Sequence, residues 1–307
     1  MTLRGASRLE RLLHHGVFCV TAETVPPRSA DPSAVIAQAR GLVGYADAAN
    51  VTDNPTSSAH MSSVAGAALV HDAGVEPIVQ LTCRDRNRLG LTSDLLGAWA
   101  LGARNVLCLT GDPPGAGDHP DAKTVFDLSV TELIGLAASL RSEGRLLSGA
   151  HIQDPPRFFI GVADVPLTDP YDFGRLERKA DAGADFVQTQ IVFDVDAFGA
   201  WAERARQRGI LERMFVLAGV AVPRGPRSAR FMREHLHGVK VPDGVITRLE
   251  EAGEDGEEEG VRLTIEIVAK LKSIKGIAGC HVMGLGRMDP VRRVIEGAGL
   301  LPRPAVA

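Results

Sequence analysis

The chain has 307 residues, of which 45% are hydrophobic and 23% charged, and its formal net charge at pH 7 is −4. These values are typical of a folded globular protein and exclude a largely disordered or collagen-like chain. The slightly negative charge and the 5% of aromatic residues argue against a protein that binds nucleic acid or an anionic membrane. No apolar run has the length of a transmembrane helix or the pattern of a signal peptide, so we expect a cytoplasmic protein.

Short, β-branched apolar runs alternate with longer helical stretches along the chain. Eight of these runs are predicted as strands. They are almost continuously apolar, as parallel strands covered on both faces are. In chain order the predicted strands are 17–23, 46–53, 77–83, 105–112, 158–163, 186–193, 214–222 and 279–285.

Helical stretches follow the predicted strands, and a glycine ends several of them as a stop signal. In chain order they are 33–45, 57–72, 86–101, 130–142, 172–182, 195–208, 227–237 and 291–298. Eight such strand–helix units predict a (β/α)8 TIM barrel, and we expect residues 1–307 to form this one domain. A doubly wound open sheet is the alternative. It is disfavoured because no glycine-rich dinucleotide fingerprint follows the first strand.

The segment 242–275 interrupts this rhythm before the last strand. It contains an acidic run at 250–259, which we interpret as a solvated turn between two helices, with a docking surface as the alternative. The predicted fold is therefore a barrel with an extra helical segment before its last strand.

The four cysteines, Cys19, Cys83, Cys108 and Cys280, are far apart and show no CxxC spacing. We interpret them as small core residues rather than as a disulfide framework or a zinc site. No P-loop, nucleophile elbow or metal-binding helix is present, so we expect no metal centre.

In a barrel of this kind the active site lies where the strands end. Three predicted strands end in carboxylates, Glu23, Asp53 and Asp112. A carboxyl group at the edge of an apolar barrel can have a raised pKa and act as a general acid near neutral pH, which is the case for Glu23. The alternatives are a capping or turn-forming role for Glu23, a turn role for Asp112, and ion pairs around the rim for Asp53.

Amide and hydroxyl groups join these acids at the same mouth, from Thr82, Gln188 and Gln190. We interpret the charged run 84–88 as structural, with its side chains forming ion pairs around the rim of the barrel. His119, in a loop, fits a ligand contact and a surface position equally well. These residues predict a barrel enzyme with an acid-rich and amide-rich mouth, but they name no substrate.

Six motifs in order resemble the methylenetetrahydrofolate reductase family, from about residue 7 to about residue 300. Each motif is weak alone, but six at the expected strand ends are specific. They are Glu-x-x-Pro-Pro at 23–27, Asp-Asn at 53–54, Leu-Thr-Cys-Arg-Asp-Arg-Asn at 81–87, Leu-Thr-Gly-Asp-Pro-Pro at 109–114, Lys-Ala-Asp-Ala-Gly-Ala-Asp-Phe-Val-Gln-Thr-Gln at 179–190 and Gly-Leu-Gly-Arg at 284–287.

The resemblance implies an oxidoreductase that reduces methylenetetrahydrofolate to methyltetrahydrofolate with NADH or NADPH, through bound FAD in a ping-pong cycle. Glu23 would be the general acid that opens the methylene bridge to an iminium. Asp112 would lie between flavin and pterin and stabilise the cationic folate. Gln190 would contact the pterin or the nicotinamide, and Arg287 would lie at the folate end.

Asp53 and Gln188 complete the expected substrate contacts. The expected flavin contacts are Gln80, Leu81, Thr82, Thr110, Gly111, Asp112, His119, Asp172 and Lys179. The resemblance also implies self-association. Because the chain lacks the long C-terminal regulatory extension of the animal enzymes, we expect no separate regulatory domain and no allosteric control by a methyl donor.

Three departures from the family pattern concern the flavin. The well-known bacterial form has an Arg where this chain has Thr110 and a His where it has Gln80, and its loop after strand five is replaced here by 163–168. Direct, flavin-free hydride transfer from NAD(P)H to folate is therefore an alternative. Two others are a pterin-binding methyltransferase-type barrel and a non-catalytic folate- or flavin-binding subunit.

Overall fold

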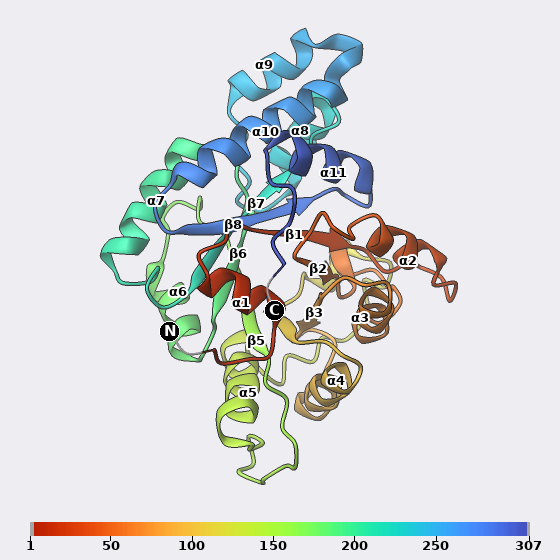
Figure 1. The fold of residues 1–307 in the computed structure, drawn as a ribbon. Coiled ribbons are helices and arrows are strands. Elements are labelled where there is room, and N and C mark those ends of the chain that lie inside the picture. Colours follow the sequence, from red (N-terminus) through yellow and green to blue (C-terminus); the bar gives the residue numbers. More distant parts are fainter. Residues whose placement is uncertain (1–2, 306–307) are drawn as a thin grey trace.

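The computed structural model describes residues 3–305, and in this range eight parallel strands close into a barrel (Figure 1). Each strand pairs with the next along the chain, and the last pairs with the first. The predicted (β/α)8 fold is thereby confirmed. The strands are β1 (Cys19–Thr24), β2 (Ala48–Val51), β3 (Pro77–Thr82), β4 (Asn105–Leu109), β5 (Phe159–Asp164), β6 (Phe186–Ile191), β7 (Phe215–Ala221) and β8 (Ile277–Met283).

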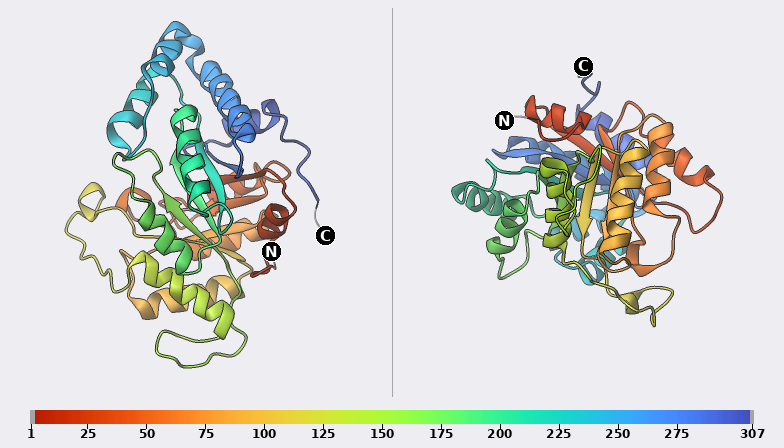
Figure 2. Two further views of the ribbon diagram at one scale, coloured as in Figure 1. Left: turned by 90° about the vertical axis from the view of Figure 1, so that its left-hand side faces the viewer. Right: turned by 90° about the horizontal axis from the view of Figure 1, so that it is seen from below.

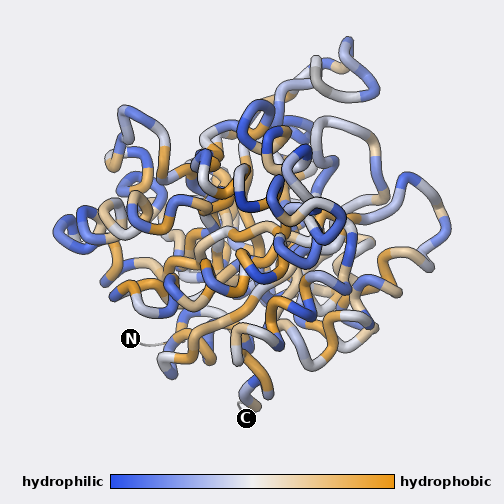
Figure 3. The backbone as a smooth tube through the Cα atoms, turned by 90° about the horizontal axis from the view of Figure 1, so that it is seen from above, coloured by the Kyte–Doolittle hydropathy of each residue, from blue (hydrophilic) through white to orange (hydrophobic). Residues whose placement is uncertain are grey.

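Helices surround the barrel and cover the outer faces of the strands. They are α2 (Ser33–Arg40), α3 (Ser63–Asp72), α4 (Arg88–Ala100), α5 (Val130–Glu143), α6 (Phe173–Asp181), α7 (Val195–Gln207), α8 (Pro226–His235) and α11 (Met288–Gly297). Several begin at a side chain that accepts a backbone N–H. The clearest case is Ser129, which forms a capping box with Glu132. Apolar segments gather inside the molecule in Figure 3, and the hydrophilic ones lie towards its edge.

One predicted helix, 57–72, begins later than its sequence suggested. The helix α3 starts at Ser63, and the 3₁₀ turn η1 (Pro55–Ser57) precedes it. Thr56 and Ser57 have positive φ values of 52° and 56°, which a right-handed helix does not allow. The chain between β2 and α3 instead forms a loop at the mouth of the barrel.

The segment before the last strand forms two helices, α9 (Asp243–Glu251) and α10 (Gly256–Ser273), joined by the 3₁₀ turn η3 (Gly253–Asp255). With α8 they project from the barrel in Figure 2. The predicted pair of helices is present, but the acidic run forms a turn only around Gly253–Asp255, since its first residues end α9 and its last residues begin α10. Four carboxylates of the acidic run form ion pairs with arginines: Glu250 with Arg230, Glu257 with Arg287, Glu258 with Arg293, and Glu259 with Arg248.

The helix α1 (Arg8–His14) closes the N-terminal end of the barrel. Its side chains Leu9, Leu12 and Leu13 are buried against a layer of inward-facing apolar residues. That layer consists of Cys19, Ala48, Ile78, Leu107, Phe159, Phe186 and Leu217. The cavity of the barrel can therefore open only towards the C-terminal ends of the strands.

The C-terminal segment is fastened to the same end of the barrel. Arg303 donates through Nε and Nη2 to the carboxylate of Asp47, at 3.1 and 2.5 Å, and through Nη2 to the carbonyl of Phe18 at 3.0 Å. The Asp47 side chain has no exposed surface, and that of Arg303 is 6% exposed. This is a buried ion pair between segments far apart in the sequence.

All four cysteines are free and buried in the described structure. Burial raises the pKa of the Cys83 thiol to about 11 and that of Cys280 to about 12, so both remain protonated at neutral pH. Among residues 3–305, no helix is both long and apolar enough to cross a membrane. In the same range, no three His, Cys, Asp or Glu side chains are grouped as metal ligands.

Candidate active site

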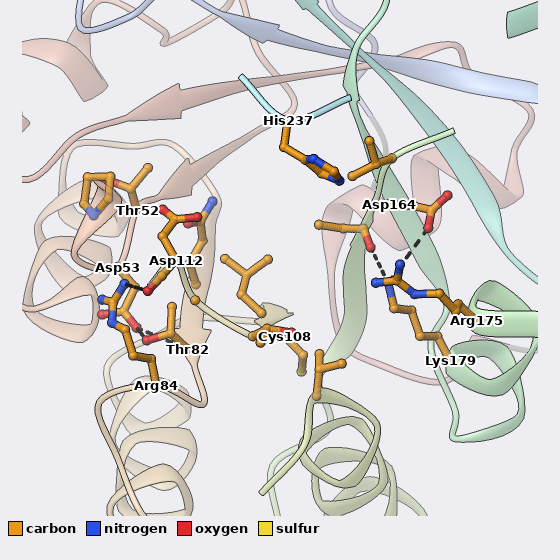
Figure 4. Close-up of a pocket in the computed structure, with 18 of the residues that line it drawn as sticks. Thr52, Asp53, Thr82, Arg84, Cys108, Asp112, Asp164, Arg175, Lys179 and His237 are labelled. Atoms are coloured by element: carbon orange, nitrogen blue, oxygen red, sulfur yellow. Dashed lines mark hydrogen bonds and ion pairs between the residues drawn. The ribbon is translucent and has the colours of Figure 1, made fainter. Parts of the chain in front are cut away.

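A cavity of about 510 Å³ lies at the C-terminal end of the barrel, next to strands β1 to β5 (Figure 4). Figure 4 shows Asp53, Thr82, Arg84 and Asp112 on one side and Asp164, Arg175 and Lys179 on the other. The sequence-predicted residues that line the cavity are Glu23, Asp53, Gln80, Thr82, Thr110, Gly111, Asp112, Asp172 and Lys179.

Glu23 is half-buried near the end of β1, where its carboxyl group lines the cavity. In the described part of the chain this carboxyl group has no side-chain hydrogen bond and no ion pair. Burial alone raises its pKa, to about 7. A carboxyl group in this state is partly protonated at neutral pH and can donate a proton to a bound ligand.

Asp53 has a different environment, although it lines the same cavity. Its carboxylate accepts hydrogen bonds from the backbone N–H and the hydroxyl of Thr82, at 2.8 and 2.9 Å. It also forms a two-pronged ion pair with Arg86, at 2.7 and 2.9 Å. These bonds fix the ends of β2 and β3 to each other and occupy the carboxylate, which favours the structural interpretation of Asp53.

Asp112 lies on the loop after β4, which is anchored through its backbone. The Asp112 carbonyl accepts hydrogen bonds from Ser57 Oγ at 2.8 Å and from Arg84 Nη1 at 3.1 Å. The guanidinium of Arg84 also bonds Asp85 twice, both at 2.7 Å. The preceding Gly111 has a φ of +96°, and a Cβ atom there would lie 2.8 Å from that of Arg84. The carboxylate of Asp112 remains exposed beside the cavity.

The opposite wall comes from β5 and α6. Lys179 Nζ donates to the carbonyl of Ala163 at 2.6 Å and lies 4.0 Å from Asp164 Oδ1. Tyr171 donates its hydroxyl to Asp164 Oδ2 at 2.5 Å. Burial lowers the pKa of Lys179 and raises that of Asp164. Asp172 is exposed and caps α6 through a bond from the Gly174 N–H at 2.9 Å.

Sequence reasoning missed the titratable lining residues Asp164, Tyr171, Arg175 and His237 on this side. The predicted fifth strand ended at residue 163, so the next residue, Asp164, was not counted among the carboxylates at strand ends. Tyr171, Arg175 and His237 lie on loops or on a helix, where no local pattern marks them.

Gln190 and Arg287 lie outside the residues that line the cavity. Gln190 donates from Nε2 to the carbonyl of His237 at 3.2 Å, which connects it to the cavity wall. Arg287, beyond β8, is bound by both oxygens of Glu257 in α10. Two further predicted residues also lie elsewhere: Leu81 packs in the core, and His119 is exposed on the loop after β4.

Gln188 lies inside the barrel, in a layer of buried polar side chains. It exchanges two hydrogen bonds with Asn50, at 2.6 and 3.0 Å, and donates to Thr21 Oγ1 at 3.2 Å. Thr21 Oγ1 in turn lies 3.0 Å from His281 Nδ1. Burial lowers the pKa of His281 to about 4, so at neutral pH the ring is neutral and its Nδ1 can accept the Thr21 hydroxyl.

The cavity leaves several polar side chains without a hydrogen-bond partner in the described structure. The hydroxyl of Thr52 is buried and unpartnered. The side chains of Glu23, Gln80 and Asp112 also make no hydrogen bond to residues 3–305. Buried polar groups such as the Thr52 hydroxyl are normally satisfied, and this set of free polar side chains is therefore suited to a ligand with several polar atoms.

Residues 8–299 match the family model described as methylenetetrahydrofolate reductase. Over 239 residues the chain is 30% identical to methylenetetrahydrofolate reductase 1 of Schizosaccharomyces pombe. This match covers 75% of this chain and 37% of that protein. The chain is 28% identical to a probable methylenetetrahydrofolate reductase (NADPH) of Caenorhabditis elegans, and this match covers 83% of this chain and 36% of that protein. Over 239 residues the chain is 25% identical to the 5,10-methylenetetrahydrofolate reductase of Salmonella typhimurium, and this match covers 75% of this chain and 72% of that protein.

The chain therefore matches less than two fifths of the length of these two eukaryotic relatives. A solved structure with a similar fold is an uncharacterized protein from Clostridium thermocellum that binds two copies of 5-methyl-5,6,7,8-tetrahydrofolic acid. It has a TM-score of 0.64 and 11% identity, and the match covers 96% of this chain and 99% of that one.

Proposed function

The chain belongs to the methylenetetrahydrofolate reductase family, and on this premise we propose that it reduces methylenetetrahydrofolate to methyltetrahydrofolate with NADH or NADPH. The observation that carries the proposal is the state of Glu23. Its carboxyl group lines the cavity, has no hydrogen bond or ion pair within residues 3–305, and has a pKa raised to about 7 by burial.

The proposed reaction needs an acid of this kind. A methylene group bridges two nitrogens of the folate, and it can accept hydride once one of its C–N bonds has opened. Glu23 donates its proton to the leaving nitrogen, the C–N bond breaks, and the remaining nitrogen forms an iminium with the methylene carbon. Hydride then reduces that carbon to a methyl group. Asp112, exposed beside the cavity, stabilises the cationic folate electrostatically.

FAD is the cofactor that the family implies, and the donor set of the cavity is compatible with it. Gln80 and Thr52 present unpartnered polar groups that can bind the edge of a polar heterocycle. Arg175 and Lys179 provide positive charge on the opposite wall, where phosphates can bind. We propose that these residues hold FAD, which when bound would carry two electrons from the nicotinamide to the folate.

Flavin-free hydride transfer remains a second candidate because of one observation. The ammonium group of Lys179 is already bonded to the carbonyl of Ala163 and lies near Asp164, so it is less available to a phosphate. The visible absorbance of the purified protein separates the two candidates. Bound FAD gives the spectrum of an oxidised flavin, whereas a colourless but active protein would show that hydride passes directly from the nicotinamide.

The substitution Glu23→Gln tests the proposed role of the acid. Glutamine preserves the shape but cannot donate a proton, so folate reduction should fall by about 10²–10⁴-fold. Oxidation of NAD(P)H by an artificial quinone acceptor, which needs no folate proton, should persist if flavin is bound. Full retention of folate reduction would remove Glu23 from the mechanism.

Asp112→Asn should slow folate reduction and alter folate binding, because it removes the negative charge beside the cationic intermediate. Unchanged kinetics with both the folate and the quinone would refute this role. The reaction class itself is tested by mixing NAD(P)H with methylenetetrahydrofolate. A pterin-binding methyltransferase-type barrel or a non-catalytic binding subunit would not oxidise the nicotinamide.

A further inference from the structure

Two carboxamides, Asn50 on β2 and Gln188 on β6, bind each other inside the barrel. Asn50 Nδ2 donates to Gln188 Oε1 at 2.6 Å, and Gln188 Nε2 donates to Asn50 Oδ1 at 3.0 Å. The residues are only 1% and 4% exposed. Each amide therefore uses one of its two N–H donors and its carbonyl oxygen on the other, which fixes the orientation of both groups at a depth where water does not compete for these bonds.

Glu23 lies directly beside this pair. The register of β1 and β2 pairs Glu23 with Asn50. Both side chains face the inside of the barrel, because Glu23 lines the cavity and Asn50 bonds Gln188 of β6. Paired strands are about 4.8 Å apart. The amide of Asn50, on the strand next to β1, is therefore close enough to reach the Glu23 carboxyl group. Asn50 nevertheless bonds Gln188, and Glu23 has no hydrogen bond in the described part of the chain.

Other ionisable groups face the cavity around Glu23 from several elements. They are Asp53 from the end of β2, Arg84 beyond β3, Cys108 from β4, Asp112 beyond β4, Asp164 from β5, Tyr171 before α6, Asp172, Arg175 and Lys179 at α6, and His237 beyond α8. From β8, the neutral ring of His281 bonds Thr21. None of these groups perturbs the pKa of Glu23, which burial alone raises to about 7.

We propose that Asn50 and Gln188 are positioning residues for the general acid, because their mutual hydrogen bonds fix the orientation of the Asn50 amide, whose second N–H then makes no bond to Glu23. The proposal rests on the proposed role of Glu23 in folate reduction. An amide released from this pair would bond the Glu23 carboxylate more strongly than the protonated acid, since hydrogen bonds to a charged acceptor are the stronger ones. It would thus favour the ionised form, which cannot donate a proton.

The test compares three variants. Gln188→Met removes the partner at nearly constant volume and frees the Asn50 amide. The apparent pKa of Glu23 should then fall by about 1 pH unit or more. Asn50→Leu combined with Gln188→Met removes both amides and should return the pKa to the wild-type value. Asn50→Leu alone leaves no amide on β2, so Glu23 should keep its wild-type pKa. This variant provides a test that does not depend on whether Gln188→Met folds.

The titration is measured by infrared spectroscopy of the protonated carboxyl stretch in the ligand-free full chain, assigned by its loss in Glu23→Gln. The acidic limb of the pH profile of folate reduction provides a second readout. An unchanged pKa in Gln188→Met, or an equal fall in the double variant or in Asn50→Leu, would overturn the proposal. The infrared titration needs no substrate, so it tests the positioning role independently of the reaction. If the expected pKa shifts are seen but the protein does not reduce the folate, only the proposed function is refuted.

Discussion

Glu23→Gln should make the folded protein more stable at alkaline pH and leave its stability at acidic pH nearly unchanged. Glutamine has the shape and neutrality of a protonated glutamate, so the two proteins differ little while Glu23 holds its proton. Above its pKa, the wild-type protein must keep a half-buried carboxylate without a hydrogen bond or an ion-pair partner among the described residues. The variant avoids this desolvation cost.

The size of the effect follows from the pKa of Glu23, which burial raises from 4.5 to about 7. Between these two values the unfolded chain has lost the proton while the folded protein still holds it. The unfolded state then binds fewer protons, so wild-type stability falls as the pH rises through this window. The loss is complete above pH 7, where the variant should be the more stable protein by on the order of 3 kcal/mol.

Urea denaturation from pH 5 to pH 8.5 measures this difference. The difference in the free energy of unfolding should be small at pH 5, grow up to about pH 7 and then stay constant. Glu234→Gln, an exposed residue on α8, is the control and should change stability little at any pH. A difference for Glu23→Gln that does not depend on pH would refute the reasoning, because it would mean that the carboxyl group titrates alike in both states.

Two further predictions concern the folded state. Arg303→Met should destabilise the protein by up to about 3–5 kcal/mol, because it leaves the buried Asp47 carboxylate with only the more distant Arg8, at 3.5 Å. In urea denaturation, a cost no larger than that of Arg213→Met, which breaks an exposed ion pair worth under about 1 kcal/mol, would contradict this. Gly161→Ala should cost about 1–3 kcal/mol, because its methyl group would collide with the Phe186 ring. An unchanged melting temperature would show that the ring can move aside.

The order of the barrel elements could be predicted from the sequence because parallel strands covered on both faces leave an apolar signal. The ends of the elements were harder to predict. The second predicted strand, 46–53, is regular only from Ala48 to Val51, because the chain turns at Asn54 and Thr56 with positive φ. Apolar character marks burial, and it does not show where strand pairing stops.

The sequence predicts the site residues that lie at or just beyond the ends of the strands. Glu23 and Asp112 were predicted in this way, and both line the cavity. Depth within the barrel and distant ion pairs leave no local signal. Gln188 and Gln190 are both polar residues of β6, yet the first is buried in the barrel interior and the second bonds a loop carbonyl. Arg287 is held by Glu257, whose contact depends on how α10 packs against the barrel.

The helix α1 and the apolar layer beneath it seal the N-terminal end of the barrel, so no ligand can reach the cavity from that end. Both reactants of the proposed reaction would therefore approach Glu23 from the side of the strand C-termini. A molecule bound against Glu23 would have to leave on the side from which the next molecule arrives. For the proposed reaction, this arrangement would favour alternate binding of the two reactants, and an excess of either reactant should inhibit binding of the other.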